Sequence, residues 1–421
     1  MDVRVYGRSD VGRVRSNNED SLLLGWPAVP GVGVFVVADG VGGEKHGDVA
    51  SEMFAREVGR RITQVGQEFG GYSASGAKDN RERLLRLLAS TTEQVNRRIH
   101  TLAQQDPELT GMCTTGVTMV LTREGVFVAH AGDSRGYLVR GEQVYQLTED
   151  HTLANQLLKK GLLKASSLDD FPYSHVITRS FGSKDEIEVD TIFIEPAPGD
   201  RFVLCTDGVH NYIDGDELRE FSGRFTEPEH LVEHLIQEAN ARGGSDNLTA
   251  VVVEIGAFER DDETAIDLER KLDFMRRLFL FKDLTDEELI RVMQSVYSVR
   301  KSKGEYIIHE GSSGEELYIV IEGLVDVLLE GRYLTSIAPG GHFGEMALID
   351  DHFRSASVVA KTDVLLLTIR RDDFIALIEN EHELVKKLLW AFLENMAGRV
   401  RDLSCEIVDL NGQLNALKRG R

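Results

Sequence analysis

The chain has 421 residues, of which 42% are hydrophobic and 28% charged, and its formal net charge is −22. This length is too great for one ordinary core and predicts two or three domains, while the negative charge argues against nucleic acid and membrane as general partners. Three scattered cysteines, Cys113, Cys205 and Cys405, argue against a disulfide framework or structural zinc. With no signal-like start and no apolar run approaching roughly 20 residues, we expect a cytoplasmic protein.

The first part of the chain, from Val3 to about Ile255, consists mostly of short β-rich runs that end in glycine turns. Residues 117–147 contain three such runs joined by REG and GDSRG, which predicts an antiparallel meander. Helical spacing of apolar residues occurs over 80–104 and 229–242. Because strands and helices do not alternate one for one, the pattern predicts α+β layers and not a parallel doubly wound sheet.

Four aspartates of this region stand where an apolar strand ends in a turn. They are Asp39 in VADGVGG, Asp133 in HAGDSRG, Asp207 in CTDGVH and Asp246 in GSDNLT. With Asn18, Glu19 and Asp20 they supply oxygen ligands of the type that Mg²⁺ or Mn²⁺ prefers. A single Asp-Gly is more often an ordinary turn, but several carboxylates at a shared rim repel one another unless a cation lies between them.

The motifs of residues 1–255 resemble the metal-dependent type 2C (PPM) family of protein Ser/Thr phosphatases in its bacterial form. The matching stretches, in family order, are SDVGRVRSNNEDS, VFVVADGVGG, GMCTTGVTMVL, GDSRGYLVR, LTEDHT, ITRSFG, VLCTDGV and SDNLTAVVV. The resemblance implies a β-sandwich flanked by helices. It also implies hydrolysis of phosphoserine and phosphothreonine in proteins by a water that two metal ions, Mn²⁺ or Mg²⁺, activate.

The same resemblance implies ligands for the two metals. Asp39 would bridge them, and the carbonyl of Gly40 would coordinate one. Asp207 and Asp246 would hold the first metal.

Further roles follow from the resemblance for residues around this pair. Glu19 or Asp20 would serve the second metal, mostly through water, and the sequence leaves open which of the two is nearer. Asp133 would help to hold the loosely bound third metal of bacterial members. Arg15 would clamp the phosphate with its planar guanidinium; the alternative for Arg15 is a solvated surface charge.

One departure from the family concerns the glycine loop, which usually continues with a histidine. Here Glu44, Lys45 and His46 follow Gly43, so either His46 or water would protonate the leaving oxygen. The segment from about 152 to 185 corresponds to the variable flap beside the site, which would set the choice of substrate.

After Gly256 a charged segment predicts a helical linker over 257–274, and glycine-cornered short strands predict a small β-roll. Residues 275–395 resemble the cyclic nucleotide-binding domain family, because they contain LFKDLTDEEL and an FGE, Leu, Arg-Ser-Ala cassette. The short helix after FGE and one guanidinium would form an anion site. By the resemblance, the sugar and cyclic phosphate would contact Gly344, Glu345, Met346, Ala347, Arg354 and Ser355.

The identity of the regulatory nucleotide depends on Ser355, which lies between the Ala common in cAMP readers and the Thr common in cGMP readers. We favour cAMP and leave cGMP open. The alternative is a ligand-free roll that serves only for dimerisation, but the cassette retains both Glu345 and Arg354.

Apolar residues alternate at spacings of four and three along the tail, the pattern of a coiled-coil seam. They are Leu389, Leu393, Met396, Val400, Leu403, Ile407, Leu410, Leu414 and Leu417. This spacing predicts a homodimer through the coiled-coil helix at 396–421. The alternative is a helix that packs back on its own β-roll.

The leading hypothesis is a dimeric phosphatase, with domain 1–256, whose substrates are phosphorylated proteins and whose rate is controlled by cyclic nucleotide. A catalytically silent adaptor switched by the nucleotide is the alternative. Loss of Asp39, Asp207 or Asp246 would have favoured the adaptor, and none is lost. The net charge disfavours a third hypothesis, a transcription regulator.

Overall fold

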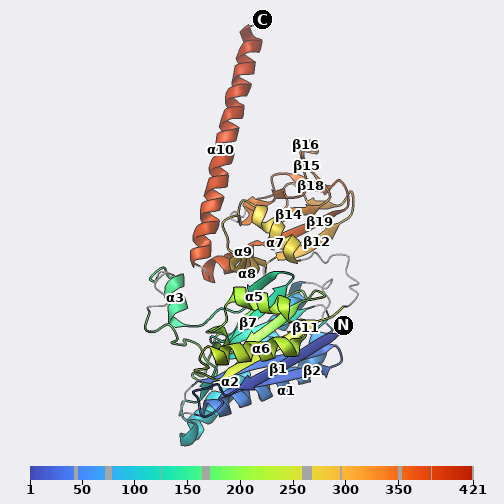
Figure 1. The fold of residues 1–421 in the computed structure, drawn as a ribbon. Helices are drawn as coiled ribbons and strands as arrows, with labels where there is room; N and C mark the ends of the chain where they lie inside the picture. The colour runs from blue at the N-terminus through green and yellow to red at the C-terminus, as the bar shows by residue number, and fades with distance from the viewer. Residues whose placement is uncertain are drawn as a thin grey trace. The chain divides into compact units, whose positions relative to one another are not determined.

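The computed structural model divides into two compact units, Met1–Glu263 and Thr264–Arg421 (Figure 1). It describes residues 1–41, 46–71, 78–123, 125–163, 171–257, 268–293, 296–348, 353–380 and 382–419. No helix among these residues is long and apolar enough to cross a membrane.

The first unit is built on two antiparallel sheets. One has the strand order β1-β11-β10-β7-β8, and the other has the order β2-β3-β5-β6-β9 with β4 paired to β3. The strands are β1 (Val3–Asp10), β2 (Asp20–Val29), β3 (Val32–Val41), β4 (Cys113–Thr114), β5 (Gly116–Leu121), β6 (Val126–Ala131), β7 (Arg135–Arg140), β8 (Gln143–Gln146), β9 (Asp190–Ile194), β10 (Arg201–Cys205) and β11 (Leu248–Ile255).

Helices cover both sheets (Figure 1). Helix α1 packs on β2 and β3, α2 on β6 and β9, and α6 on β1 and β11. In α2 the buried side chains of Leu84, Leu88, Val95 and Ile99 recur at helical spacing, which explains why this segment folds as an amphipathic helix. The helices of this unit are α1 (Gly47–Gly70), α2 (Lys78–Gln105), η1 (Pro107–Leu109), α3 (Leu153–Lys159), α4 (Asp207–His210), α5 (Gly215–Arg224) and α6 (Pro228–Ala241). The predicted helix-flanked sandwich is confirmed.

The predicted meander over 117–147 is wrong in one respect. Strands β5 and β6 form a hairpin in one sheet, whereas β7 and β8 form a hairpin in the other. The chain changes sheets at GDSRG, where Gly132 has φ +109 and a Cβ would lie 2.4 Å from the Cβ of Thr115. Only glycine fits this backbone without strain, and the crossing places Asp133 between the two sheets along the chain.

The second unit contains two four-stranded antiparallel sheets, β12-β19-β14-β17 and β13-β18-β15-β16, which confirm the β-roll. Its strands are β12 (Val296–Lys301), β13 (Tyr306–Ile308), β14 (Glu316–Glu322), β15 (Val325–Leu329), β16 (Arg332–Ile337), β17 (His342–Phe343), β18 (Ser357–Ala360) and β19 (Val364–Arg370). Its helices are α7 (Leu268–Arg277), α8 (Asp286–Met293), η3 (Glu345–Leu348), α9 (Arg371–Asn380) and α10 (His382–Arg419). Residues 258–267 of the predicted linker lie outside the described residues.

Candidate functional site

The carboxylates predicted from the sequence form one cluster in the first unit. Asp20 begins β2 directly opposite Asp39 near the end of β3, and Asp207 begins α4 one residue after β10 ends. The charges of Asp20, Asp207, Asp133 and Asp246 all act on Asp39. Residues more than 200 positions apart therefore meet at one site.

Burial and mutual repulsion raise the pKa values of four of these carboxyl groups, Asp20, Asp39, Asp133 and Asp207. The pKa of Asp39 lies well above its ordinary value because of burial and then the charges of Asp20 and Asp207. Burial, with the charge of Asp207, also raises the pKa of Asp20 and of Asp133, each to about 7. Burying several carboxylates close together is unfavourable unless a cation neutralises their charge. The cluster therefore has the electrostatic character of a metal site.

Two oxygen atoms show that the cluster fits a cation. The Oδ1 atoms of Asp20 and Asp133 are buried and have no hydrogen-bond partner among the described residues. The Oδ2 atom of Asp20 accepts hydrogen bonds from Thr206 Oγ1 at 2.8 Å and Thr249 Oγ1 at 2.7 Å. One oxygen of Asp20 is thus fixed by the protein while the other remains available as a ligand.

The glycine after Asp39 permits a close backbone approach. A Cβ on Gly40 would lie 2.2 Å from the carbonyl oxygen of Gly47 and 2.7 Å from that of Glu19. The Oε2 atom of Glu19 in turn approaches Gly47, 2.9 Å from where its Cβ would be. Glu19 and Asp20 therefore both lie at the cluster.

Sequence reasoning overlooked the residues that orient these ligands. Besides Thr206 and Thr249, Asn247 accepts a hydrogen bond from the backbone N–H of Glu19 at 2.8 Å and donates to the carbonyl of Asn17 at 2.9 Å. The signal was available, since Thr206 and Asn247 directly adjoin Asp207 and Asp246 in the CTDG and SDNLT motifs.

Arg15 lies at the cluster and is not a free surface charge. Its Nη2 atom pairs with Asp246 Oδ2 at 2.8 Å, and hydrogen bonding to Asp246 and the charges of Glu19 and Asp39 raise its pKa. Its side chain is 46% exposed, so an incoming anion can reach it.

Most of the glycine loop lies outside the described residues. His46 is exposed, has φ 60 and accepts the first backbone hydrogen bond of α1, from Ala50, through its carbonyl oxygen. Gly43, Glu44 and Lys45 lie outside the described residues.

One residue of the flap, His175, acts electrostatically on Asp207 and was not singled out from the sequence. Burial and the charge of Asp246 raise the pKa of Asp207, while the charge of His175 acts in the opposite direction. His175 is exposed and stands between Ser174 and Val176, whose backbone N–H groups bond to Phe171 and Tyr173.

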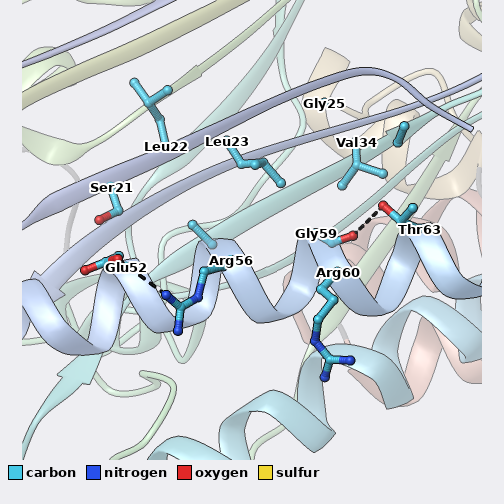
Figure 2. A pocket seen from close by; sticks show the side chains of 12 residues that line it. Ser21, Leu22, Leu23, Gly25, Val34, Glu52, Arg56, Gly59, Arg60 and Thr63 are labelled. Atoms are coloured by element: carbon cyan, nitrogen blue, oxygen red, sulfur yellow. Dashed lines mark hydrogen bonds and ion pairs between the residues drawn. The ribbon is translucent and has the colours of Figure 1, made fainter.

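An open pocket of about 420 Å³ lies elsewhere in this unit, between β2, β3 and α1 (Figure 2). Leu23 of β2 points toward α1, which contributes Arg56 and Arg60 to the lining, whereas Leu22 points to the other side of the strand. None of its lining residues is a predicted site residue, so the pocket is distinct from the carboxylate cluster.

The second unit gathers the predicted nucleotide residues around Arg354. This residue is 8% exposed, and its Nη2 donates to the carbonyl of Glu316 at 2.9 Å and pairs with the Glu316 carboxylate at 3.3 Å. Its Nη1 donates to the carbonyl of Gly344 at 3.3 Å. Gly344 has φ +80, and a Cβ there would lie 2.6 Å from Arg354 Nη1, so glycine is required.

The remaining cassette residues lie on or beside this site. Glu345 and Ala347 of η3 are buried, Met346 is half exposed, and Ser355 is exposed next to Arg354. Residues 349–352, between η3 and the arginine, lie outside the described residues.

Comparison with known proteins agrees with this geometry. A family model described as Protein phosphatase 2C matches residues 11–251, more than half of the chain. The chain belongs to the protein phosphatase 2C family. A second model, Cyclic nucleotide-binding domain, matches residues 298–381. The protein is thus a metal-dependent Ser/Thr phosphatase with a C-terminal cyclic nucleotide-binding domain.

Named bacterial relatives match the phosphatase unit. Serine/threonine phosphatase stp of Listeria innocua is 32% identical over 255 residues, which cover 60% of this chain and 96% of that protein. Protein phosphatase PhpP of Streptococcus pneumoniae is 35% identical over 257 residues, covering 61% and 98%. The structure of the Mycobacterium tuberculosis phosphatase PstP/Ppp is similar with a TM-score of 0.51 and 29% identity, and the match covers 61% of this phosphatase and 99% of that chain.

Proposed function

We propose that the carboxylate cluster binds two divalent cations, Mn²⁺ or Mg²⁺, and a weaker third. Asp39 and the Gly40 carbonyl, with Asp207 and Asp246, would hold the central pair. When bound, the cations supply an activated water and neutralise the phosphate oxygens. The observation that carries this proposal is the buried cluster itself, in which raised pKa values accompany oxygen atoms without partners.

For the second metal we propose Asp20 as the nearer ligand, with Glu19 acting through water. The buried Oδ1 of Asp20 supports this choice, because Thr206 and Thr249 already satisfy its other oxygen. Asp133, whose Oδ1 is also buried without a partner, would serve the third metal.

Arg15 would bind the phosphate of phosphoserine or phosphothreonine. Its bond to Asp246 holds the guanidinium beside the cluster, and its exposure leaves room for the substrate. A planar guanidinium matches two phosphate oxygens. The proton for the leaving oxygen would come from His46 or from water.

We further propose that cyclic nucleotide, cAMP more than cGMP, regulates the phosphatase. Support comes from the buried Arg354, which two carbonyl groups and Glu316 hold in position before any ligand arrives. A preorganised guanidinium loses little entropy when it pairs with a cyclic phosphate. Gly344, Glu345, Met346, Ala347 and Ser355 would complete the site.

A homodimer through α10 is also proposed. The predicted seam residues Leu389, Leu393, Val400 and Ile407 are 48–63% exposed in the single chain, as expected if a second copy covers them. The side chains of Leu403, Leu410, Leu414 and Leu417 lie outside the described residues.

The proposed domains are the phosphatase at 1–256, a linker at 257–274, the nucleotide domain at 275–395 and the dimerisation helix at 396–421. The end of β11 at Ile255 supports the first limit.

One experiment tests the proposed chemistry. The full-length protein is stripped with a chelator and then assayed on a phosphothreonine peptide as Mn²⁺ is returned. We expect no turnover without metal and full recovery with it. Undiminished turnover in the chelator would reject the metal mechanism, and no turnover at any Mn²⁺ concentration would favour the silent adaptor.

A further inference from the structure

One imidazole connects the Asp133 loop to the flap. The backbone N–H of His151 donates to the Gly132 carbonyl at 2.9 Å, and the N–H of Gly132 donates to His151 Nδ1 at 3.2 Å. Gly132 is therefore held from both sides by a single residue. Because Gly132 directly precedes Asp133, these two bonds fix the backbone from which that carboxylate projects.

The opposite edge of the ring faces an ion pair. His151 Nε2 lies 3.2 Å from Asp190 Oδ2, and Arg179 Nη1 donates to Asp190 Oδ1 at 2.8 Å. A backbone N–H can only donate, so Nδ1 is an acceptor and the ring proton lies on Nε2, facing the carboxylate. Burial alone would raise the pKa of Asp190, but its hydrogen bond to His151 and the charges of His151, His130 and Arg179 outweigh burial and lower this pKa.

The same residue also holds the returning strand of the flap. The carbonyl of His151 accepts from the backbone N–H of Thr178 at 2.7 Å and from its hydroxyl at 2.9 Å. Leu153 N–H bonds to the Val176 carbonyl at 2.8 Å, so the pairing continues to the residue beside His175. Arg179 immediately follows Thr178, and the ion pair is thus part of the flap attachment.

This group of side chains is not itself suited to a metal. The ligand atoms of His130, His151 and Asp190 lie within 4.8 Å of one another, but Arg179 Nη1 is 3.1 Å from His151 Nε2. A fixed guanidinium at that distance repels a cation, and both nitrogen atoms of His151 are already engaged. The group is therefore a hydrogen-bond network that positions backbone.

We propose that His151 is a positioning residue that couples the flap to the metal affinity of Asp133. Its Nδ1 holds the Gly132–Asp133 backbone, and the opposite edge of its ring faces Asp190 of β9, which Arg179 of the flap holds in place. This inference rests on the proposed function, in which Asp133 binds the weakest metal. Groups that orient a metal ligand typically change metal affinity by about 10- to 100-fold when removed.

Two substitutions test the two ring nitrogen atoms of His151 separately. In His151→Asn the amide oxygen can take the place of Nδ1 and still accept from Gly132, while the contact with Asp190 is lost. In His151→Gln the amide can reach Asp190 but leaves the Gly132 N–H without its acceptor. His130→Gln is the matched control, because this ring stacks on His151 at 4.8 Å but does not bond to Gly132.

The measurement is Mn²⁺ binding to the full-length protein by calorimetry, with folding checked by circular dichroism. We expect the dissociation constant of the weakest site to rise about tenfold in His151→Gln, to rise about three- to fivefold in His151→Asn, which loses only the contact with Asp190, and to stay unchanged in His130→Gln. In an Asp133→Asn background, His151→Gln should cause no further change, because both then act on the same site.

Several results would overturn the inference. Equal Mn²⁺ affinity in His151→Gln and wild type would contradict it. An equal loss of Mn²⁺ affinity in His151→Asn and His151→Gln would also contradict it, because it would indicate a role in packing only. If His151→Gln does not fold, Asp190→Asn is measured in its place. We expect this variant to bind Mn²⁺ about three- to fivefold more weakly at the weakest site. Unchanged Mn²⁺ affinity in Asp190→Asn would contradict the coupling. A wild-type protein that binds no Mn²⁺ would instead reject the proposed function.

Discussion

Asp20 and Asp133 each bury a carboxylate oxygen that lacks a hydrogen-bond partner among the described residues. An unsatisfied buried polar atom costs about 1–3 kcal/mol, so the metal-free fold is less stable than it would be with uncharged residues in these places. A bound cation offsets this cost. The stability of the protein should therefore report directly on the state of its site.

We expect the metal-free protein to lose stability between pH 6.5 and 8. The pKa values of Asp20 and Asp133, about 7 when folded, exceed the roughly 3.9 of an unfolded chain. The folded state then binds more protons, and the free energy of unfolding falls by about 1–2 kcal/mol as pH rises through 7. His130 and His210, with pKa values lowered to about 4 by burial, act oppositely but chiefly below pH 6.5.

Denaturant unfolding in EDTA at the two pH values measures this effect. Asp133→Asn should reduce the decrease, since one of the carboxyl groups with a raised pKa is removed. A free energy of unfolding that stays constant or rises over this interval would contradict the assigned electrostatics.

Asp39→Asn should abolish turnover while leaving the protein folded. The substitution removes the carboxylate proposed to bridge the two cations and keeps the size of the side chain. A phosphopeptide assay at saturating Mn²⁺ tests this, with Asp216→Asn on the exposed face of α5 as the control. Wild-type turnover by a folded Asp39→Asn protein would show that the bridging role is wrong.

Arg354→Ala should weaken nucleotide binding by roughly 10- to 150-fold, which corresponds to a charge-assisted bond of about 1.5–3 kcal/mol. Calorimetry with cAMP and cGMP gives the affinity, and Arg332→Ala on the exposed strand β16 is the control. Equal affinity in Arg354→Ala and wild type would place the phosphate elsewhere.

At the scale of elements, the sequence predicted the strands and helices better than their assignment to sheets. The run 117–147 has the alternation and turns of a meander, and nothing in that periodicity indicates that the chain leaves one sheet at Gly132. Prediction of the metal site from the sequence had the same limit, because it also depends on how strands pair. Motif spacing identified Asp39, Asp207 and Asp246, but the hydrogen bonds from Thr206 and Thr249 to Asp20 depend on the pairing of β10 with β11, which the motifs do not indicate.

Truncation after Glu394 should give a monomer that still binds nucleotide but is poorly regulated, because the proposed dimer seam is lost. Sedimentation gives the oligomeric state, and the phosphatase assay gives the response to nucleotide. A truncated protein that is monomeric and retains the full response would rule out a mechanism carried by the dimer.

Point substitutions in α10 test whether the predicted seam, and not another face of the helix, forms the dimer interface. Val400→Glu with Ile407→Glu should dissociate the dimer, since both residues belong to the predicted seam. Val408→Glu, at an equally exposed position beside the seam, should not. Dissociation by both changes would indicate a different interface.

At the scale of the whole molecule, the central claim is that one chain couples a metal-dependent phosphatase to a cyclic nucleotide. A ligand shifts activity only if it binds two states of the protein with different affinity. We infer that nucleotide rearranges the helices next to the β-roll, α7 and α10, and through them the phosphatase domains of the proposed dimer. Typical coupling of about 1–3 kcal/mol would change the linked equilibrium by roughly 5- to 150-fold.

The most direct test is the rate of phosphopeptide hydrolysis by the full-length protein at saturating Mn²⁺, with no nucleotide, with cAMP and with cGMP. Binding of each nucleotide is verified by calorimetry on the same preparation. We predict that cAMP changes the rate at least about fivefold and that Arg354→Ala abolishes the change. An identical rate with and without bound nucleotide would contradict the account.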